Sequence, residues 1–261
     1  MRVKLVVEYD GTRYAGWQRQ KNAVAVQQRL EEAIWAVTGE HQTVTGASRT
    51  DAGVHALGQC VHFDTRCGIP AEKFSFALNT RLPEDIRVVA SAQAADDFHA
   101  RFMACGKRYR YLYCNRPHQS ALARNFSWHV FWPLDVDKMR AAGQLLLGYR
   151  DFAAFMAAGS PVKDTRRTLT YLDVQREGDF VTLTVEGDGF LYNMVRIIAG
   201  NLNYVGQGKM PPEMLMELLN GAPRRLGGPT APPQGLRLER VFYPGDEANW
   251  HPPQGQTARE T

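Results

Sequence analysis

The sequence has little that would place the protein in a membrane or in an oxidising environment. Only four of its 261 residues are cysteine, and no two of them form a C-x-x-C pair. Scattered thiols are typical of reduced cysteines in a cytosolic protein. The longest apolar stretch, residues 152–159, is far shorter than the roughly 18 residues of a membrane span. The amino terminus shows no signal-peptide pattern, so we expect a cytoplasmic protein.

Several widespread catalytic motifs are absent as well. The chain has no G-x-x-x-x-G-K-[ST] phosphate loop, no G-x-G-x-x-G at a strand-to-helix turn, no H-E-x-x-H and no G-x-S-x-G. These absences argue against the common forms of nucleotide hydrolysis, dinucleotide binding, zinc proteolysis and serine-esterase chemistry.

Charge of either sign is also nearly balanced. The chain has 31 Lys and Arg against 27 Asp and Glu, a net charge of +4, and residues 1–103 contain 12 of each sign. The excess therefore lies in residues 104–261. A basic second half favours an anionic partner, although so small an excess is common in proteins without one.

Hydrophobic periodicity predicts two similar halves. The first half has strands at 3–9, 42–47, 59–64 and 86–91 and helices at 26–38 and 70–82. The second half has strands at 107–114, 168–176, 180–186 and 236–243 and helices at 135–147, 191–205 and 211–219.

We therefore expect an α+β protein made of two ferredoxin-like βαββαβ halves, similar to RNA-recognition modules, with antiparallel sheets and an active-site cleft between them. The predicted domains are residues 1–103 and 104–244. Residues 245–261 are rich in Gly and Pro and are predicted to be disordered.

The stretch G-A-S-R-T-D-A-G-V-H, residues 46–55, is the first candidate site. It is a poor strand and a poor helix, so it reads as a loop between two strands. One interpretation is a structural turn, in which Asp51 accepts backbone N–H groups and Gly53 supplies a positive φ. The other is a functional loop, because Arg49, Asp51 and His55 are crowded on a segment that a sheet supports.

Two patterns in the second half admit two interpretations each. Residues 107–113 interleave Lys and Arg with tyrosines, as in a surface that stacks bases and binds phosphates. An amphipathic strand whose tyrosines pack in a core explains the same pattern.

Arg196 lies off the apolar stripe of the 191–205 helix, where it either needs a buried carboxylate or reaches solvent.

Assembled in order, the motifs resemble those of the TruA-type tRNA pseudouridine synthases. The matching stretches are D-G-T-R-Y-A-G-W-Q-R-Q (10–20), R-T-D-A-G-V-H (49–55), F-H-A-R-F (98–102), R-Y-R-Y (108–111), F-L-Y-N-M-V-R (190–196) and G-L-R-L (235–238). They cover nearly the whole chain in the order of the family. One departure is Ser48, which stands where we expect glycine.

The resemblance implies isomerisation of uridine to pseudouridine at positions 38, 39 and 40 in the anticodon arm of tRNA. It implies a homodimer, no cofactor or metal, and neither DNA nor a membrane as partner. Carried over by position, Asp51 is the catalytic carboxylate and Arg49 occupies the space vacated by the flipped uridine. Tyr109 stacks on the target base, and Arg196 pairs with Asp51.

Elementary chemistry agrees with these roles. A base inside a helical stem must be flipped out, at a cost of a few kcal/mol, before a protein group can reach it. One carboxylate suffices because the leaving uracil is also the returning nucleophile, whereas a glycoside hydrolase needs two. Two alternatives stay open at this stage: a non-catalytic RNA-binding protein, and a nucleoside hydrolase that releases free uracil.

Overall fold

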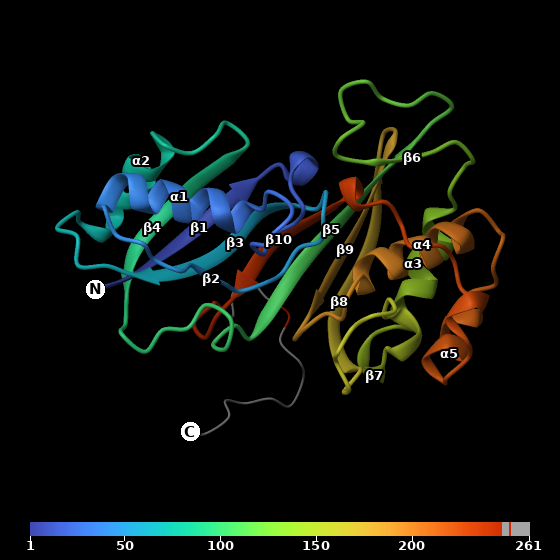
Figure 1. The fold of residues 1–261 in the computed structure, drawn as a ribbon. Coiled ribbons are helices and arrows are strands. Elements are labelled where there is room, and N and C mark those ends of the chain that lie inside the picture. Colours follow the sequence, from blue (N-terminus) through green and yellow to red (C-terminus); the bar gives the residue numbers. More distant parts are fainter. Residues whose placement is uncertain (247–250, 252–261) are drawn as a thin grey trace. The chain divides into compact units, whose positions relative to one another are not determined.

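The computed structural model describes residues 1–246 and 251 and forms two compact units (Figure 1). The first unit comprises Met1–Cys105 together with Arg237–Pro244. The second unit comprises Gly106–Leu236 together with the described residues Gly245, Asp246 and His251. Each unit combines a sheet with helices, so the predicted α+β class is confirmed.

The first unit is a sheet on which two helices pack. Its elements are β1 (Arg2–Tyr9), α1 (Val26–Thr38), β2 (Thr45–Gly46), β3 (His55–Asp64), α2 (Phe74–Asn79), β4 (Ile86–Ala94) and β10 (Leu236–Phe242). β1 lies between β4 and β3 and is antiparallel to both. β2 pairs antiparallel with the later part of β3, while β10 pairs parallel with its first residues.

The core of the first unit follows from the alternation along β1. Val3, Leu5, Val7 and Tyr9 are buried, and the side chains between them are more exposed. The helices add apolar residues at helical spacing, namely Leu30, Ala33 and Ile34 from α1 and Phe74 and Leu78 from α2. Gly39, with φ of 74°, ends α1 where the sequence predicted.

The second unit has a sheet in the order β5-β9-β8-β7, antiparallel throughout. Its elements are β5 (Gly106–Asn115), β6 (Trp128–Val130), α3 (Val136–Gln144), β7 (Gly148–Asp151), β8 (Arg166–Glu177), β9 (Phe180–Gly187), α4 (Met194–Gly206) and α5 (Met214–Leu219). The short β6 runs parallel to β5, so this pair and the pair β3–β10 correct the prediction of antiparallel sheets. α3 packs on β8 and on α4 and so contributes to the core of this unit (Figure 1).

Several elements differ from the sequence-based expectation. β10, predicted as the last strand of the second domain, groups with the first unit because Arg237 and Leu238 pair with β3. The strand predicted at 42–47 is shorter in the structure, where only β2 is a strand. Side chains of α1, and not a neighbouring strand, bond the backbone of Val44. The N–H of Val44 donates to Glu31 at 3.1 Å. Its carbonyl accepts from Gln27 at 3.0 Å.

The helix predicted at 70–82 contracts to α2 after a 3₁₀ turn at Ala71–Lys73. It ends at Asn79 because that side chain bonds both backbone groups of Val88, at 2.9 and 2.8 Å. β6 and β7 were not predicted, since three or four residues are too short to show a period.

Across residues 1–246 and 251, no helix is both long enough and apolar enough to cross a membrane. The tail predicted to be disordered, 245–261, lies outside the described residues except for Gly245, Asp246 and His251.

His62 joins β3 to the segment after β4. The side chain is buried, and its Nδ1 accepts a hydrogen bond from the N–H of Ala100 at 3.1 Å. The ring meets those of Phe98 and His99 edge-on. Burial, with smaller contributions from Arg2 and His99, lowers the pKa of His62 below its ordinary value. The neutral ring is therefore the form that the folded state holds.

We expect the chain to lose stability as the pH falls below about 6.5, because the unfolded state then takes up a proton that folded His62 resists. His62→Asn keeps an acceptor for Ala100 but does not titrate, so its free energy of unfolding should depend less on pH. The difference should be on the order of 1 kcal/mol, because a proton on Nδ1 would break the hydrogen bond from Ala100. Urea unfolding on either side of that pH measures it. His118→Asn, at an exposed histidine, should follow the wild type, and equal pH dependence in all three chains would contradict the assignment.

Candidate active site

The loop between β2 and β3 carries Arg49 and Asp51 and is fixed at its base by Gln59. The amide of Gln59 is fully buried; its oxygen accepts from the N–H of Ser48 at 3.2 Å, and its nitrogen donates to the carbonyl of Ser48 at 2.5 Å. The side chain thus acts as a strand partner for Ser48. One backbone bond, from Ala47 to the carbonyl of Cys60, completes the base of the loop.

Hydrogen bonds on either side of Asp51 fix the upper part of the loop. The hydroxyls of Thr50 and Tyr9 are 2.7 Å apart and buried. The carbonyl of Thr50 accepts from the N–H of Trp17 at 3.0 Å. After Asp51 the chain turns at Gly53, with φ of 76°, and the N–H of Val54 donates to the carbonyl of Asp51 at 3.1 Å. Asp51 is half-buried and Arg49 is exposed.

Residues 10–17 lie directly against this loop, and glycine makes the approach possible. A Cβ on Gly16, which has φ of +88°, would lie 2.5 Å from the carbonyl oxygen of Thr50. A Cβ on Gly11 would lie 2.0 Å from the carbonyl oxygen of Val54. The two longest motifs of the first half therefore form one packed structure around Asp51.

His55 and Ser48 have structural roles in the same assembly. The buried ring of His55 accepts at Nδ1 from the N–H of Gly11, 3.0 Å away. Ser48 stands where we expected glycine, but among the described residues other than glycine only Asn193 has a positive φ. The loop therefore does not need glycine at position 48.

In the second unit β5 contributes three tyrosines, all of them buried. Tyr111 and Tyr113 are fully buried, and their hydroxyls donate to the carbonyls of Pro232 and Ala199 at 2.8 and 2.9 Å. Burial raises the pKa of both hydroxyls. Tyr109 is 6% exposed and its ring meets that of Phe190 edge-on, with centroids 5.0 Å apart. The core-packing interpretation thus holds for Tyr111 and Tyr113.

Arg108 also has an internal partner. Its guanidinium forms a 2.5 Å ion pair with Glu186, a carboxylate that is completely buried in β9. A buried carboxylate without its cation is strongly unfavourable, so this arginine stabilises the sheet. Interleaved basic and aromatic residues on β5 therefore mark a folded core as much as a nucleic-acid surface.

Arg196 is half-buried in the first turn of α4, and the contacts of its guanidinium include two short hydrogen bonds. Its Nε donates to the carbonyl of Ala231 and its Nη1 to Oδ1 of Asn193, both at 2.7 Å. Asn193 precedes the helix with φ of 60°, a conformation that asparagine tolerates better than most residues. The hydroxyl of Tyr113 connects β5 to α4, so Tyr109 and Arg196 lie on neighbouring elements.

The four predicted site residues thus fall into two pairs. Arg49 and Asp51 share one loop of the first unit, and Tyr109 and Arg196 belong to the second. The ion pair between Asp51 and Arg196 stays a prediction. Sequence reasoning missed the supporting residues Gln59 and Tyr9. The one signal for Gln59 is an amide within an otherwise apolar stretch of β3.

Comparison with known proteins identifies the class of the protein. The model of the family described as tRNA pseudouridine synthase matches residues 5–103 and 142–244. The chain belongs to this family, so the predicted family and enzyme class are confirmed: it is an isomerase that converts uridine to pseudouridine in tRNA.

Curated relatives give a closer identification. A protein of Thermoanaerobacter sp. (strain X514) named tRNA pseudouridine synthase A is 50% identical over 241 residues, covering 92% of this chain and 99% of that protein. Proteins of the same name are 49% identical in Acetivibrio thermocellus, with the same coverage, and 47% identical in Ruminiclostridium cellulolyticum, over 93% of this chain and 99% of that protein.

The contact between Gly16 and Thr50 predicts a loss of activity on substitution by alanine. Gly16→Ala introduces both an unfavourable φ and a clash with the backbone beside Asp51. If Asp51 is the catalytic carboxylate, as predicted from the sequence, pseudouridine formation should fall about 100-fold. Gly39→Ala is a matched control, because Gly39 has φ of +74° but no neighbouring atom within 4 Å. It should cost about 1–2 kcal/mol of stability and leave turnover unchanged. Equal turnover in the two variants would show that the packing against Thr50 does not position Asp51.

Proposed function

We propose that this enzyme is cytoplasmic and modifies positions 38, 39 and 40 in the anticodon arm of tRNA, with Asp51 as its catalytic carboxylate. The observation that supports this most directly is the loop of Asp51, which the Gln59 amide, the Tyr9–Thr50 hydrogen bond and the glycine contacts hold in one conformation. Catalysis needs a group that is fixed before the substrate arrives. The homodimer and the cleft between two ferredoxin-like halves stay predictions.

The reaction places few demands on the protein beyond one carboxylate. The bond between C1′ and N1 breaks, the uracil turns, and C1′ bonds to C5, whose proton leaves and is balanced by protonation of N1. No atom is gained or lost. Because the displaced base returns as the nucleophile, a second carboxylate to activate water is unnecessary, and water has to be kept away from the sugar.

The other proposed residues support base flipping. Arg49 is exposed on the same loop as Asp51, so its guanidinium can occupy the space that the uridine leaves in the stem. Tyr109, whose 6% exposed ring meets that of Phe190 edge-on, is the proposed stacking partner of the target base. Arg196, in an orientation fixed by Asn193 and Ala231, is the proposed counter-ion that keeps Asp51 ionised.

Family membership favours this proposal over the two alternatives considered from sequence. A protein that only binds RNA would leave the substrate unchanged, and a nucleoside hydrolase would release uracil. The mass of the RNA separates these cases, because isomerisation conserves mass whereas hydrolysis removes the base. Mapping pseudouridine in unmodified tRNA after incubation with the enzyme locates the modified positions.

The central prediction concerns Asp51→Asn. The amide keeps the size of the side chain but is a far poorer nucleophile and base, so the variant should fold and bind tRNA while pseudouridine formation falls at least about 100-fold. A binding titration and a pseudouridine assay on the same preparation measure both effects. Asp97→Asn, at an exposed carboxylate of the same unit, should behave as the wild type. Turnover of Asp51→Asn within about tenfold of the wild type, less than about 1.4 kcal/mol in the barrier, would falsify the assignment.

A second prediction separates the ring of Tyr109 from its hydroxyl. Tyr109→Phe keeps the ring face and its contact with Phe190, so it should retain much more turnover than Tyr109→Ala if stacking is the main role. Single-turnover kinetics at saturating tRNA compare the two variants. Equal losses in both would assign the function to the hydroxyl, as in proton transfer from C5.

A further inference from the structure

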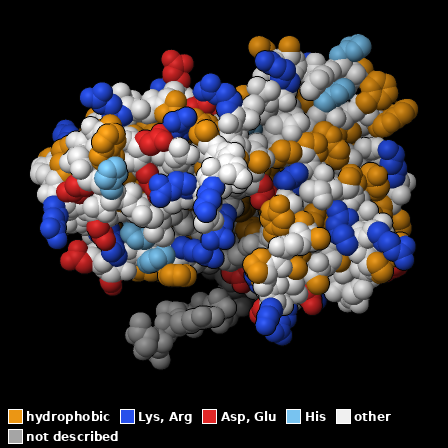
Figure 2. Space-filling model, in the orientation of Figure 1, with side chains coloured by type: hydrophobic (Ala, Val, Ile, Leu, Met, Phe, Trp, Pro, Cys, Tyr) orange, Lys and Arg blue, Asp and Glu red, His pale blue; other side chains and the backbone are white. Residues whose placement is uncertain are grey.

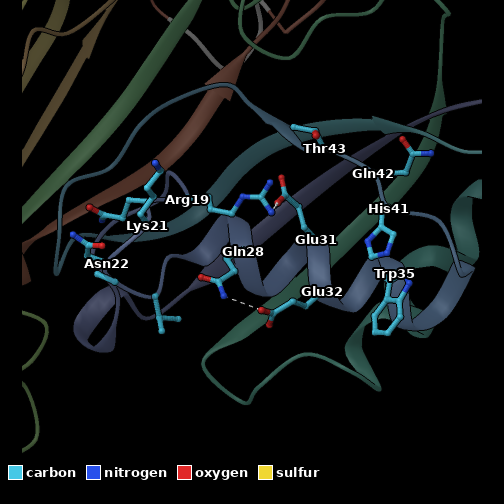
Figure 3. Close-up of a pocket in the computed structure, with 13 residues that line it drawn as sticks. Arg19, Lys21, Asn22, Gln28, Glu31, Glu32, Trp35, His41, Gln42 and Thr43 are labelled. Atoms are coloured by element: carbon cyan, nitrogen blue, oxygen red, sulfur yellow. Dashed lines mark hydrogen bonds and ion pairs between the residues drawn. The ribbon is translucent and has the colours of Figure 1, made fainter.

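A groove of about 630 Å³ lies along the outward side of α1 in the first unit (Figure 3). Its walls come from three parts of the chain: residues 19–24, residues 28–35 of α1, and residues 41–43 before β2. None of the four proposed site residues lines it. The groove is therefore a concave surface whose lining the proposed chemistry does not explain.

One end of the groove is aromatic. The indole of Trp35 is 50% exposed and stacks on the ring of His41, with centroids 5.3 Å apart and planes 10° from parallel. Figure 3 shows the two rings one above the other at this end. A tryptophan on a helix surface contributes little to a core, but it provides a flat, partly exposed face on which a planar group can stack.

The middle of the groove contains two carboxylates whose charges are already compensated. Glu31 is buried and pairs through Oε2 with Arg19 at 3.0 Å. Glu32 accepts from Arg29 at 2.8 Å and from Gln28 at 2.9 Å. Arg19 itself stays 57% exposed and has five N–H donors, so it can bind an anion while it neutralises Glu31.

The other end of the groove is basic and polar. Lys21 and Asn22 are exposed there, away from the aromatic end (Figure 3). Lys21 makes no ion pair within residues 1–246 and 251. Gln28 and Trp35 are seven residues apart on α1, about 10 Å along the axis. The groove is thus longer than one base and suits a stacked base followed by sugar and phosphate.

We infer that this groove binds an unpaired stretch of the RNA substrate, with one base stacked on Trp35 and a phosphate near Lys21 and Arg19. The inference rests on the proposed function, because it takes tRNA as the ligand. Lys, Arg, Asp and Glu side chains are intermingled on the visible face of this unit in Figure 2, so overall charge does not single out the groove. What favours RNA is the combination of a stacking ring, amides that can meet base edges, and a lysine without a carboxylate partner.

The test compares Trp35→Ala with Trp35→Phe on unmodified tRNA. Loss of the ring should raise both Kd and KM at least about fivefold, the low end for one base stacked on an aromatic side chain. The rate at saturating tRNA should stay within about twofold of the wild type, because Asp51 is untouched. Trp35→Phe keeps a stacking face and should restore most of the affinity. Phe76→Ala, at a 72% exposed ring of the same unit outside the groove, is the matched control and should leave Kd unchanged.

Lys21→Gln provides an independent measurement that does not involve the aromatic end. Removing one phosphate contact should reduce the slope of log Kd against log salt concentration by about 0.7, the value for single-stranded nucleic acid. This variant also tests RNA binding in the groove if Trp35→Ala fails to fold, since Lys21 is exposed and lies outside the helix. An unchanged slope would contradict a phosphate at this end.

The outcomes separate the groove from the proposed function. If the wild-type enzyme forms no pseudouridine in tRNA, both proposals are overturned. If it does, and Trp35→Ala leaves Kd and KM unchanged, the groove is not an RNA site although the proposed function stands. If Trp35→Ala changes the mass of the particle in light scattering and not the affinity for tRNA, the groove is a protein interface and the inference is wrong. A p-benzoylphenylalanine at position 35 that crosslinks to an unpaired nucleotide of bound tRNA would support the inference directly.

Discussion

The hydrogen bonds of the Gln59 amide are the contacts on which the loop of Asp51 depends. They hold Ser48 in a buried position where no strand is available, because β2 ends at Gly46. From this fixed point the chain needs only three residues to reach Asp51. With Thr50 bonded to Tyr9 and to Trp17, the loop has little freedom left. A buried amide that makes both of its bonds specifies a conformation better than an apolar side chain of the same size, which would leave the backbone of Ser48 unsatisfied.

In the second unit, contacts with a distant segment likewise fix the position of Arg196. The segment 229–232 lies on α4 so closely that a Cβ on Gly200 would be 1.6 Å from the carbonyl oxygen of Pro229. This approach brings the carbonyl of Ala231 to the guanidinium, while the N–H of Ala231 donates to the carbonyl of Arg196. In each unit a distant segment bonds to the residue proposed for chemistry or to its chain neighbour, and a glycine permits the close approach.

The sequence predicted the elements whose period is long and clear, and it failed where side chains replace a regular partner. α1 and the β8–β9 hairpin were predicted to within a few residues. Their apolar residues recur several times, at helical spacing in α1 and largely at every second residue in the two strands. The length of β2 was overestimated because the side chains of Glu31 and Gln27 bond the backbone of Val44 in place of a strand. Hydrophobic periodicity does not reveal such side-chain contacts. Asp51 could be singled out from its motif, but Gln59 could not, because a polar residue in a strand shows its role only once its partner is known.

The basic residues also show that the role of a polar side chain depends on partners that the sequence pattern does not reveal. The charge excess of the second half favoured an anionic partner, yet Arg108 is committed to buried Glu186, and Arg140 binds Asp173 and the carbonyl of Val174. Cations paired in this way contribute to folding, and their internal partners leave fewer of their N–H donors for RNA phosphates. Affinity for tRNA therefore depends on the cations that remain exposed beside groups able to stack on bases. Because flipping a uridine costs a few kcal/mol, an enzyme gains when contacts away from the reacting base supply binding energy that offsets this cost.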